Sequence, residues 1–354
     1  MAVDETRRAI TPTNTPESSR RTVLLGHGGG GKLTQDLIAS VFLPSFDNES
    51  LRALGDSAVL GLPTGSRIAF TTDSYVVKPL FFPGGDIGRI AVCGTVNDLA
   101  MAGARPLFIS AAFIVEEGLS VDTLADVARS MRLAADEAGV AIVTGDTKVV
   151  ERGGADGLFV TTAGVGVVPE GVEVSVARAR PGDAVLVSGA IGDHGIAIAT
   201  RRSGIEMTAE VVSDAAPLNG LVAAMLAGGV AVHSLRDATR GGVAAVLNEI
   251  ASASGVGVLV REGAIPVHGP VQAACDLLGF DPLSVANEGK LVAVVAEKDA
   301  GRALDTLRST RYGEEAALIG EITSEPRGKV LLKTRIGGTR IVAMPSGELL
   351  PRIC

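Results

Sequence analysis

The chain has 354 residues, of which 46% are hydrophobic and 20% are charged, and its formal net charge is -8. This length favours two packed domains, because single hydrophobic cores stop growing beyond about 250 residues. The acidic balance argues against a nucleic-acid surface, and the sequence has no uncharged apolar run long enough for a membrane span. We therefore expect a cytoplasmic protein that acts on small molecules and on other proteins.

Residues 1–21 are rich in Thr, Pro, Ser and Arg, which is typical of a disordered leader. In the first half that follows, apolar spacing predicts helices at 86–104 and 121–138 and strands at 67–77, 105–117, 141–150 and 157–168. A turn at 180–183 opens the second half. There we predict helices at 217–226, 241–253, 271–278 and 300–307, and strands at 184–192, 230–235, 255–260, 291–297, 316–322 and 329–334. Because many strands are neighbours in sequence, an α+β fold with mixed sheets is favoured over a doubly wound parallel one.

A glycine-rich segment, GHGGGGK at 26–32, lies between a strand-like VLL and a helix-like stretch. Consecutive glycines can turn backbone N–H groups toward a phosphate, which makes this segment a candidate nucleotide loop. Its spacing matches a Walker A loop up to Leu33, where that loop needs a hydroxyl for magnesium, so a flexible loop without a ligand is an equal alternative. The candidate contacts are Gly28, Gly29, Gly30 and Lys32.

Five aspartates lie at or near the ends of apolar segments, beside Gly, Thr or Asn: Asp56, Asp73, Asp98, Asp146 and Asp237. Magnesium prefers hard oxygen ligands, usually one or two carboxylates together with phosphates and water. Several such aspartates converging would form a Mg-ATP site without a Walker loop. Any one of them alone is better explained as a cap or a turn residue.

Three further kinds of side chain are candidates for chemistry. Lys148 follows the sequence GDT and Glu288 lies in NEGK just before a strand, so either could be tuned for acid–base work, although surface roles are equally consistent. His27 and His194 lie in glycine-rich loops, where contacts with phosphate or substrate are an option. For the other two histidines we expect structural roles.

The three cysteines form no CxxC pair, so neither a zinc site nor a disulfide framework is indicated. We expect Cys93 and Cys275 to be buried thiols that act as small hydrophobic groups. Cys354 differs from both because it is the last residue, at the end of PSGELLPRIC. One Gly and two Pro in these ten residues predict a mobile arm instead of a regular element.

The ordered set GHGGGGK, GDSAVL, TTDSYVV, GTVNDLAMAGA, VTGDTKVV, IGDHG, RDATRGG, NEGK and the terminal PRIC closely resembles the HypE family of hydrogenase maturation proteins. The resemblance covers the chain from about Gly26 to Cys354. That family is similar to the aminoimidazole ribonucleotide synthetase and selenophosphate synthetase group. The longer polar leader before Val23 departs from the usual family pattern.

The resemblance implies a PurM-like fold of two domains in a homodimer. An ATP-binding and dimerisation domain at 22–170 would pair its mixed sheet with the partner subunit in a shared β-barrel. An α+β domain would follow at 171–343, and a flexible tail at 344–354. The resemblance also implies that four aspartates hold magnesium and phosphates, namely Asp56, Asp73, Asp98 and Asp237.

The reaction that the resemblance implies is carried on Cys354. A carbamoyltransferase, HypF, would load a carbamoyl group onto the thiol, and ATP would then drive its dehydration to an S-cyanate. The cyanide would pass to iron held by a complex of HypC and HypD, for nickel-iron hydrogenase. Lys148 and Glu288 would deprotonate and orient the thiocarboxamide. The alternatives are a related ATP-dependent synthetase, against which the absence of a reactive cysteine beside Lys32 counts, and an ATP-binding scaffold without chemistry of its own.

Overall fold

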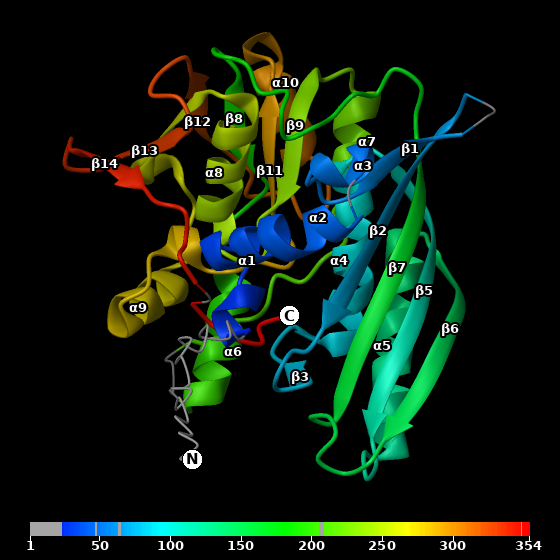
Figure 1. The fold of residues 1–354 in the computed structure, drawn as a ribbon. Coiled ribbons are helices and arrows are strands. Elements are labelled where there is room, and N and C mark those ends of the chain that lie inside the picture. Colours follow the sequence, from blue (N-terminus) through cyan, green and yellow to red (C-terminus); the bar gives the residue numbers. More distant parts are fainter. Residues whose placement is uncertain (1–22, 47, 63–64, 205–208, 348) are drawn as a thin grey trace, which may run out of the picture.

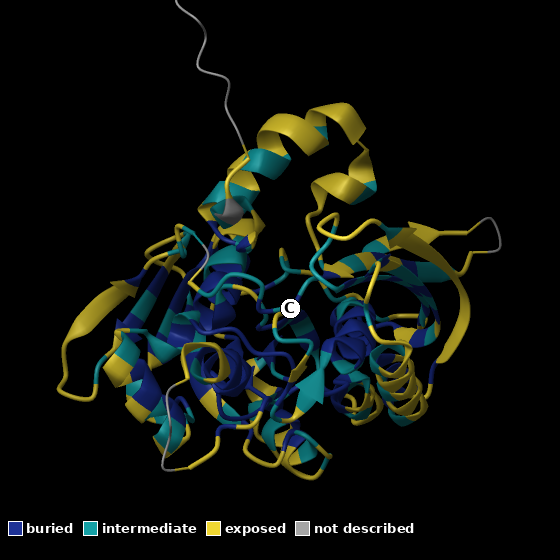
Figure 2. Ribbon diagram, turned by 90° about the horizontal axis from the view of Figure 1, so that it is seen from below, coloured by how far each residue is buried: buried dark blue, intermediate teal, exposed yellow. Residues whose placement is uncertain are grey.

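The structure is a computed structural model that describes residues 23–46, 48–62, 65–204, 209–347 and 349–354, so the predicted leader at 1–21 lies outside the described residues. Two β-sheets stand side by side, and the C-terminus lies between them at the centre of the molecule (Figures 1 and 2). Within the described residues, every helix is too short or too polar to cross a lipid bilayer.

The first sheet has the strand order β1-β2-β7-β5-β6, formed by β1 (Ala58–Gly61), β2 (Arg67–Tyr75), β7 (Leu158–Val168), β5 (Arg105–Glu116) and β6 (Ala141–Val150). It is mixed, because β5 pairs in parallel with β6 and in antiparallel with β7. Helices α4 (Ile87–Met101) and α5 (Val121–Ala138) pack on one face. Buried residues alternate strictly along β7, as expected for a strand with only one face in the core.

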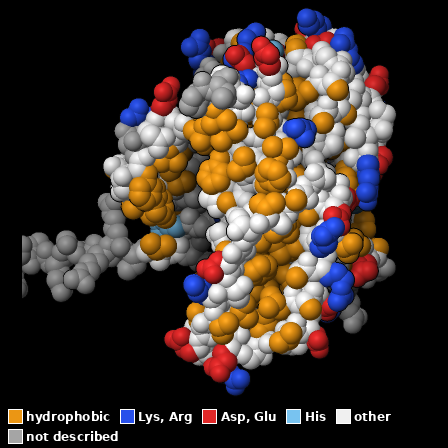
Figure 3. Space-filling model, turned by 90° about the vertical axis from the view of Figure 1, so that its right-hand side faces the viewer, with side chains coloured by type: hydrophobic (Ala, Val, Ile, Leu, Met, Phe, Trp, Pro, Cys, Tyr) orange, Lys and Arg blue, Asp and Glu red, His pale blue; other side chains and the backbone are white. Residues whose placement is uncertain are grey.

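The other face of this sheet is apolar and uncovered (Figure 3). Nearly every residue of β6, which is an edge strand, is exposed. The large exposed hydrophobic side chains on the sheet are Val59, Leu60, Phe70, Phe108, Ile114, Ile142, Val143 and Val149. An apolar surface of this extent is typical of a face that another protein covers.

The second sheet has the order β14-β13-β10-β12-β8-β11-β9, formed by β14 (Thr339–Val342), β13 (Lys329–Lys333), β10 (Gly257–Arg261), β12 (Ala317–Thr323), β8 (Ala184–Val187), β11 (Leu291–Val295) and β9 (Val232–Asp237). Its central strands are buried on both faces, which explains the continuous apolar run of β11. One face packs on α8 (Gly242–Ser254), and the other on α7 (Asn219–Ala227) and α10 (Ala300–Arg308).

The remaining elements surround the space between the sheets. They are η1 (Leu25–Gly28), α1 (Lys32–Leu37), η2 (Ile38–Phe42), α2 (Leu43–Phe46), α3 (Glu49–Arg52), β3 (Phe81–Phe82), β4 (Gly85–Asp86), α6 (Asp193–Ser203), η3 (Glu262–Ala264), α9 (Gly269–Leu278), η4 (Pro282–Ser284) and η5 (Glu297–Asp299). Two expectations were wrong here. The VLL segment runs into a 3-10 turn instead of a strand, and the IGDHG segment opens helix α6 instead of forming a loop.

Candidate functional site

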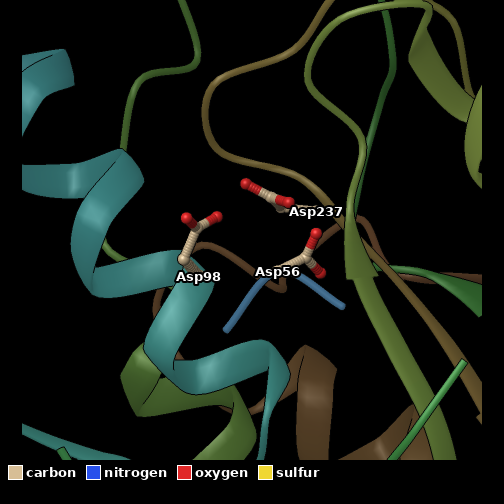
Figure 4. A group of neighbouring side chains, drawn as sticks. All are labelled: Asp56, Asp98 and Asp237. Carbon is tan, nitrogen blue, oxygen red and sulfur yellow. The ribbon is translucent and has the colours of Figure 1, made fainter. Parts of the chain in front are cut away.

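Three of the predicted aspartates converge in the space between the sheets (Figure 4). Asp56 precedes β1, Asp98 lies on α4, and Asp237 ends β9. One carboxylate oxygen from each lies within 4.8 Å of the others. Thr71 Oγ1 holds the group in place, at 2.7 Å from Asp98 Oδ2 and 2.9 Å from the carbonyl oxygen of Asp56. Residues from both halves of the chain therefore build one acidic centre.

The electrostatics of this centre favour a bound cation. Desolvation, together with the neighbouring carboxylates, raises the pKa of Asp56 and of Asp98 well above the usual range. Desolvation also raises the pKa of Asp237 to about 6, although Arg236 opposes it. Clustered carboxylates with raised pKa values are poorly compensated in the protein alone, and hard oxygen donors are the set that Mg²⁺ prefers. The three side chains thus fit a magnesium ion.

Asp73 lies on β2 and lines the same pocket. Its carboxylate accepts a hydrogen bond from the Tyr75 hydroxyl at 3.0 Å. Desolvation raises the pKa of Asp73, and Arg240 opposes this shift. Tyr75 fits against α4 only because residue 94 is glycine, since a Cβ on Gly94 would lie 2.2 Å from the tyrosine hydroxyl. The predicted fourth aspartate therefore joins the site without belonging to the tight group of three.

Two arginines of the pocket were missed from the sequence. Arg236 forms ion pairs with Asp56 and with Glu249 of α8. Arg240 lines the pocket, and Cys354 is the main cause of the rise in its pKa. Both arginines lie in the RDATRGG motif, of which the sequence analysis selected only the aspartate. Their partners are distant in sequence, so no local signal identified the arginines as part of the site.

Glu288 is buried in the same pocket, with 3% of its surface exposed. Its Oε1 atom has no hydrogen-bond partner among the described residues. Burial, followed by Asp237 and Asp214, raises the pKa of Glu288 well above the usual range. The rest of NEGK fixes this position: Asn287 donates to the carbonyl oxygen of Ala238, and Lys290 pairs with Asp214 at 3.2 Å. A buried carboxylate with a free oxygen is suited to act as a base.

Cys354 lines this pocket together with Glu288 and the acidic centre. The tail that carries it lies packed against the body, with Ile353 only 2% exposed. Figure 2 shows the C-terminus in the buried zone between the two halves. The structure thus describes the tail in the inward position, and the predicted mobility of residues 344–354 stays a prediction.

The glycine-rich segment borders the pocket. Gly30 lines it, the carbonyl oxygen of Gly28 accepts a hydrogen bond from Arg240, and Gly29 lines a small second pocket that Ile353 of the tail also lines. The side chain of Lys32 is exposed, while its backbone N–H donates to the carbonyl oxygen of Pro345 at 3.0 Å. This loop therefore contacts both the acidic pocket and the root of the tail.

Asp146 and Lys148 do not join this pocket within one chain. Both lie on the edge strand β6, where they form an exposed ion pair at 3.6 Å. The side chains of Asp146 and Lys148 are 64% and 74% exposed. If either acts at the site, a different copy of the chain must supply it.

The other candidate residues have structural positions. His194 is buried between Ser213 and the tail, His233 pairs with Asp183, and His268 pairs with Asp193. Cys93 and Cys275 are buried, as predicted, and burial raises the pKa of their thiols to about 12 and about 11. The ring of His27 bonds locally, to Leu24.

Comparisons with known proteins agree with this arrangement. Residues 54–168 match the family "AIR synthase related protein, N-terminal domain", and residues 180–333 match the corresponding C-terminal domain. The chain is 54% identical to Carbamoyl dehydratase HypE of Cupriavidus necator over 330 residues, covering 93% of this chain and 94% of the relative. It is 47% identical to Carbamoyl dehydratase HypE of Escherichia coli, covering 94% and 99%.

Solved structures give the same result. The chain superimposes on a HypE chain of a HypE-HypF complex with a TM-score of 0.83 and 51% identity, covering 87% of this chain and 99% of that one. For hydrogenase maturation protein HypE in complex with ATP, the TM-score is 0.80 at 49% identity, covering 94% and 100%. A ThiL structure complexed with AMPPCP and TMP shares only 16% identity at a TM-score of 0.68, which indicates a shared fold alone.

Proposed function

Because this chain belongs to the HypE family of carbamoyl dehydratases, we propose that it is an enzyme that uses ATP to dehydrate a carbamoyl group on its own Cys354. The product is an S-cyanate, which supplies the cyanide ligand in nickel-iron hydrogenase maturation. The observation that carries this proposal is the position of Cys354. The last residue of the chain lies in one pocket with a buried base candidate, Glu288, and with the acidic centre.

The reaction needs ATP because a carboxamide oxygen is a poor leaving group. Attack of this oxygen on the γ-phosphorus of ATP releases ADP, and loss of the resulting phosphate leaves the nitrile. The nitrogen gives up two protons on the way. Glu288 can accept one of these protons. Its pKa is raised, so its carboxylate is a stronger base than that of an exposed glutamate. A pocket between packed domains also excludes water, which would otherwise hydrolyse the activated intermediate.

The acidic centre is the proposed binding site for magnesium. Asp56, Asp98 and Asp237 would hold the ion, with Asp73 beside them. Magnesium supplies charge neutralisation for the phosphates of ATP. The glycine-rich segment, with Gly28, Gly29, Gly30 and Lys32, is proposed to contact the phosphates from the other side.

The family also indicates the partners. A HypE structure contains HypF, so we propose HypF as the donor of the carbamoyl group here. HypC and HypD, as an iron-carrying complex, are the proposed acceptors. We further propose that the protein acts in the cytoplasm and that its domains meet near residue 170, between the last strand of the first sheet and the first strand of the second.

We also propose a homodimer that uses the apolar face of the first sheet. Burial of this face, with β6 at its edge, would remove a large exposed apolar surface from water. It would also give Lys148 and Asp146 a place in the reaction. Both are exposed on β6 of their own chain, and in a dimer they could act at the pocket of the partner subunit.

The test of the function follows the terminal thiol. Replacing Cys354 with Ser should abolish nitrile formation and leave ATP binding unchanged, because no other thiol lies in the pocket. In the unmodified protein, mass spectrometry of the C-terminal peptide should show a carbamoyl adduct that loses the mass of one water after ATP is added. An unmodified peptide in both states would contradict the proposal and favour an ATP-binding scaffold.

A further inference from the structure

The last three residues of the tail pair with the chain just after β2 in the manner of an added strand. Val76 N–H donates to the carbonyl oxygen of Cys354 at 3.0 Å, and Lys78 N–H donates to that of Arg352 at 3.3 Å. The side chain of Arg352 adds a bond in the other direction, since its Nε donates to the carbonyl oxygen of Val76 at 2.9 Å. The body therefore reads the main chain of the tail at alternate residues, which fixes its register and the position of the thiol.

Arg202, on α6, adds a second set of main-chain contacts. Its guanidinium donates to the carbonyl oxygen of Lys78 at 2.5 Å and also to the carbonyl oxygens of Pro351 and Arg352. The planar guanidinium thus bridges the body and the tail. Because these acceptors are backbone oxygens, these three contacts recognise the path of the main chain.

The side chain of Arg352 has its own partners. It forms an ion pair with Asp156, which also pairs with Lys78 at 2.9 Å. Its guanidinium carbon lies 6.0 Å from the ring centre of Phe159 on β7. Arg352 and Lys78 together hold the pKa of Asp156 below its usual value, so this carboxylate stays charged at neutral pH.

Ile353 is buried and belongs to the main hydrophobic cluster of the first half, of which Val77 and Phe82 are also members. His194 Nε2 lies 2.8 Å from its carbonyl oxygen, while Nδ1 lies 2.8 Å from Ser213 Oγ. Burial lowers the pKa of His194, so the ring is neutral at pH 7. A neutral ring satisfies both contacts when Nε2 carries the proton for the carbonyl and Nδ1 accepts from the serine hydroxyl.

Building on the proposed function, we propose that Arg202, Asp156 and His194 form a socket specific for the sequence Pro-Arg-Ile-Cys, and that they are positioning residues for the dehydration step. Asp156 selects arginine, the core pocket selects isoleucine, and Arg202 fixes the path of the backbone. The socket stabilises the inward tail, so the carbamoylated sulfur is delivered beside Glu288 in a single orientation. Loss of the socket leaves the chemistry intact and lowers the fraction of tails in place.

The socket can be tested by measuring the accessibility of the Cys354 thiol, without ATP or a carbamoyl group. Cys93 and Cys275 are fully buried, so an alkylating reagent reports on Cys354. Replacing Asp156 with Ala should speed alkylation of Cys354 about five-fold, as expected for loss of a partly exposed ion pair. Replacing Arg202 with Ala should have a larger effect, because it removes contacts on both sides of the junction. The matched control is Asp126→Ala, which breaks the exposed pair with Arg129 on α5 and should change nothing.

The two half-reactions then separate positioning from stability. The tail sequence is unchanged in these variants and its thiol is more accessible, so loading by the carbamoyltransferase should not slow. ATP-dependent dehydration should fall, and it should fall further in Arg202→Ala than in Asp156→Ala. Asp156→Glu, which keeps the charge, should recover part of the loss. Unchanged alkylation in both variants would overturn the socket, and faster alkylation with unchanged dehydration would overturn its positioning role. If the unmodified protein forms no nitrile, the proposed function fails while the alkylation result still decides the socket.

Discussion

At the scale of single residues, the pocket is dominated by charge. Six acidic side chains and two arginines line it, and the most buried of the acids have raised pKa values. This arrangement lowers the stability of the protein without ligands, because like charges face one another in a pocket that is shielded from water. The same arrangement is useful once cations and phosphates enter. The side chains that destabilise the protein without ligands are therefore the ones that favour ligand binding.

This cost predicts how stability depends on pH. The folded-state pKa of Asp237 is about 6, against an ordinary value of 3.8, so the folded protein binds more protons than the unfolded chain between these values. The free energy of unfolding must then fall as pH rises through this interval, by up to about 1.4 kcal/mol per pH unit for each such group. Urea unfolding in EDTA between pH 4 and 7 measures this slope.

A substitution identifies the groups responsible. Asp237→Asn cannot ionise, so its free energy of unfolding should fall less steeply over the same range, and it should exceed that of the unmodified protein at pH 7. Glu262→Gln, on the surface of the second half, is the control and should keep the full slope. If the free energy of unfolding depends on pH in the same way in Asp237→Asn and in the unmodified protein, the raised pKa of Asp237 is contradicted.

Five of the six acidic residues that line the pocket were selected from the sequence, because they lie beside small or turn-forming residues near the ends of apolar segments, whereas Glu249 was not selected. One pocket is lined by these selected residues and by the terminal cysteine, namely Asp56, Asp73, Asp98, Asp237, Glu288 and Cys354. The sequence could not identify Arg236 or Arg240, whose roles depend on partners far along the chain. Tyr75, which donates to Asp73 two residues earlier, was also not selected. The sequence also could not show that Asp146 and Lys148 lie outside the pocket of their own chain. The sequence places them on a strand, but it does not show that this strand forms an exposed edge of the sheet.

At the scale of elements, the close packing of α4 against β2 sets the shape of the pocket. Gly94 allows this approach, because any larger residue would collide with the Tyr75 hydroxyl. Gly94→Ala should therefore destabilise the protein by about 1–3 kcal/mol, as over-packing does elsewhere, and weaken ATP binding through the displaced Tyr75 and Asp73. Thermal unfolding and nucleotide titration measure the two effects.

The matched control is Gly301→Ala on α10, where no atom lies within 4 Å of the added methyl group. Alanine has the higher helix propensity, so this variant should be neutral or slightly more stable. Equal effects of the two substitutions would show that the contact with Tyr75 does not matter.

Most elements were predictable because their apolar patterns are regular. The helix predicted at 121–138 matches α5, which begins at the Ser120 cap and ends at Gly139 in the left-handed conformation. Helix α6 was missed because it begins in a glycine-rich stretch that reads as a loop. Strand β14 was missed because it is short and mostly exposed at a sheet edge, so it has no apolar pattern.

At the scale of the whole molecule, the exposed ion pair of Lys148 and Asp146 predicts an active site shared between subunits. Mixing Lys148→Ala and Glu288→Ala proteins after dissociation should restore activity, because a mixed dimer then contains one complete site. Random pairing gives about a quarter of the unmodified activity in a symmetric dimer. Each variant alone should be inactive, and mixtures that stay inactive would place Lys148 outside the partner's site.

The root of the tail sets a limit on how the subunits of the maturation machinery can be arranged. Pro345 is held by Lys32 of the glycine-rich segment, and Cys354 follows nine positions further along the chain. A fully extended chain of that length spans only about 30 Å. With Pro345 held there, the sulfur moves only within that distance, so the proposed donor and acceptor proteins must each place their reaction centres near this pocket.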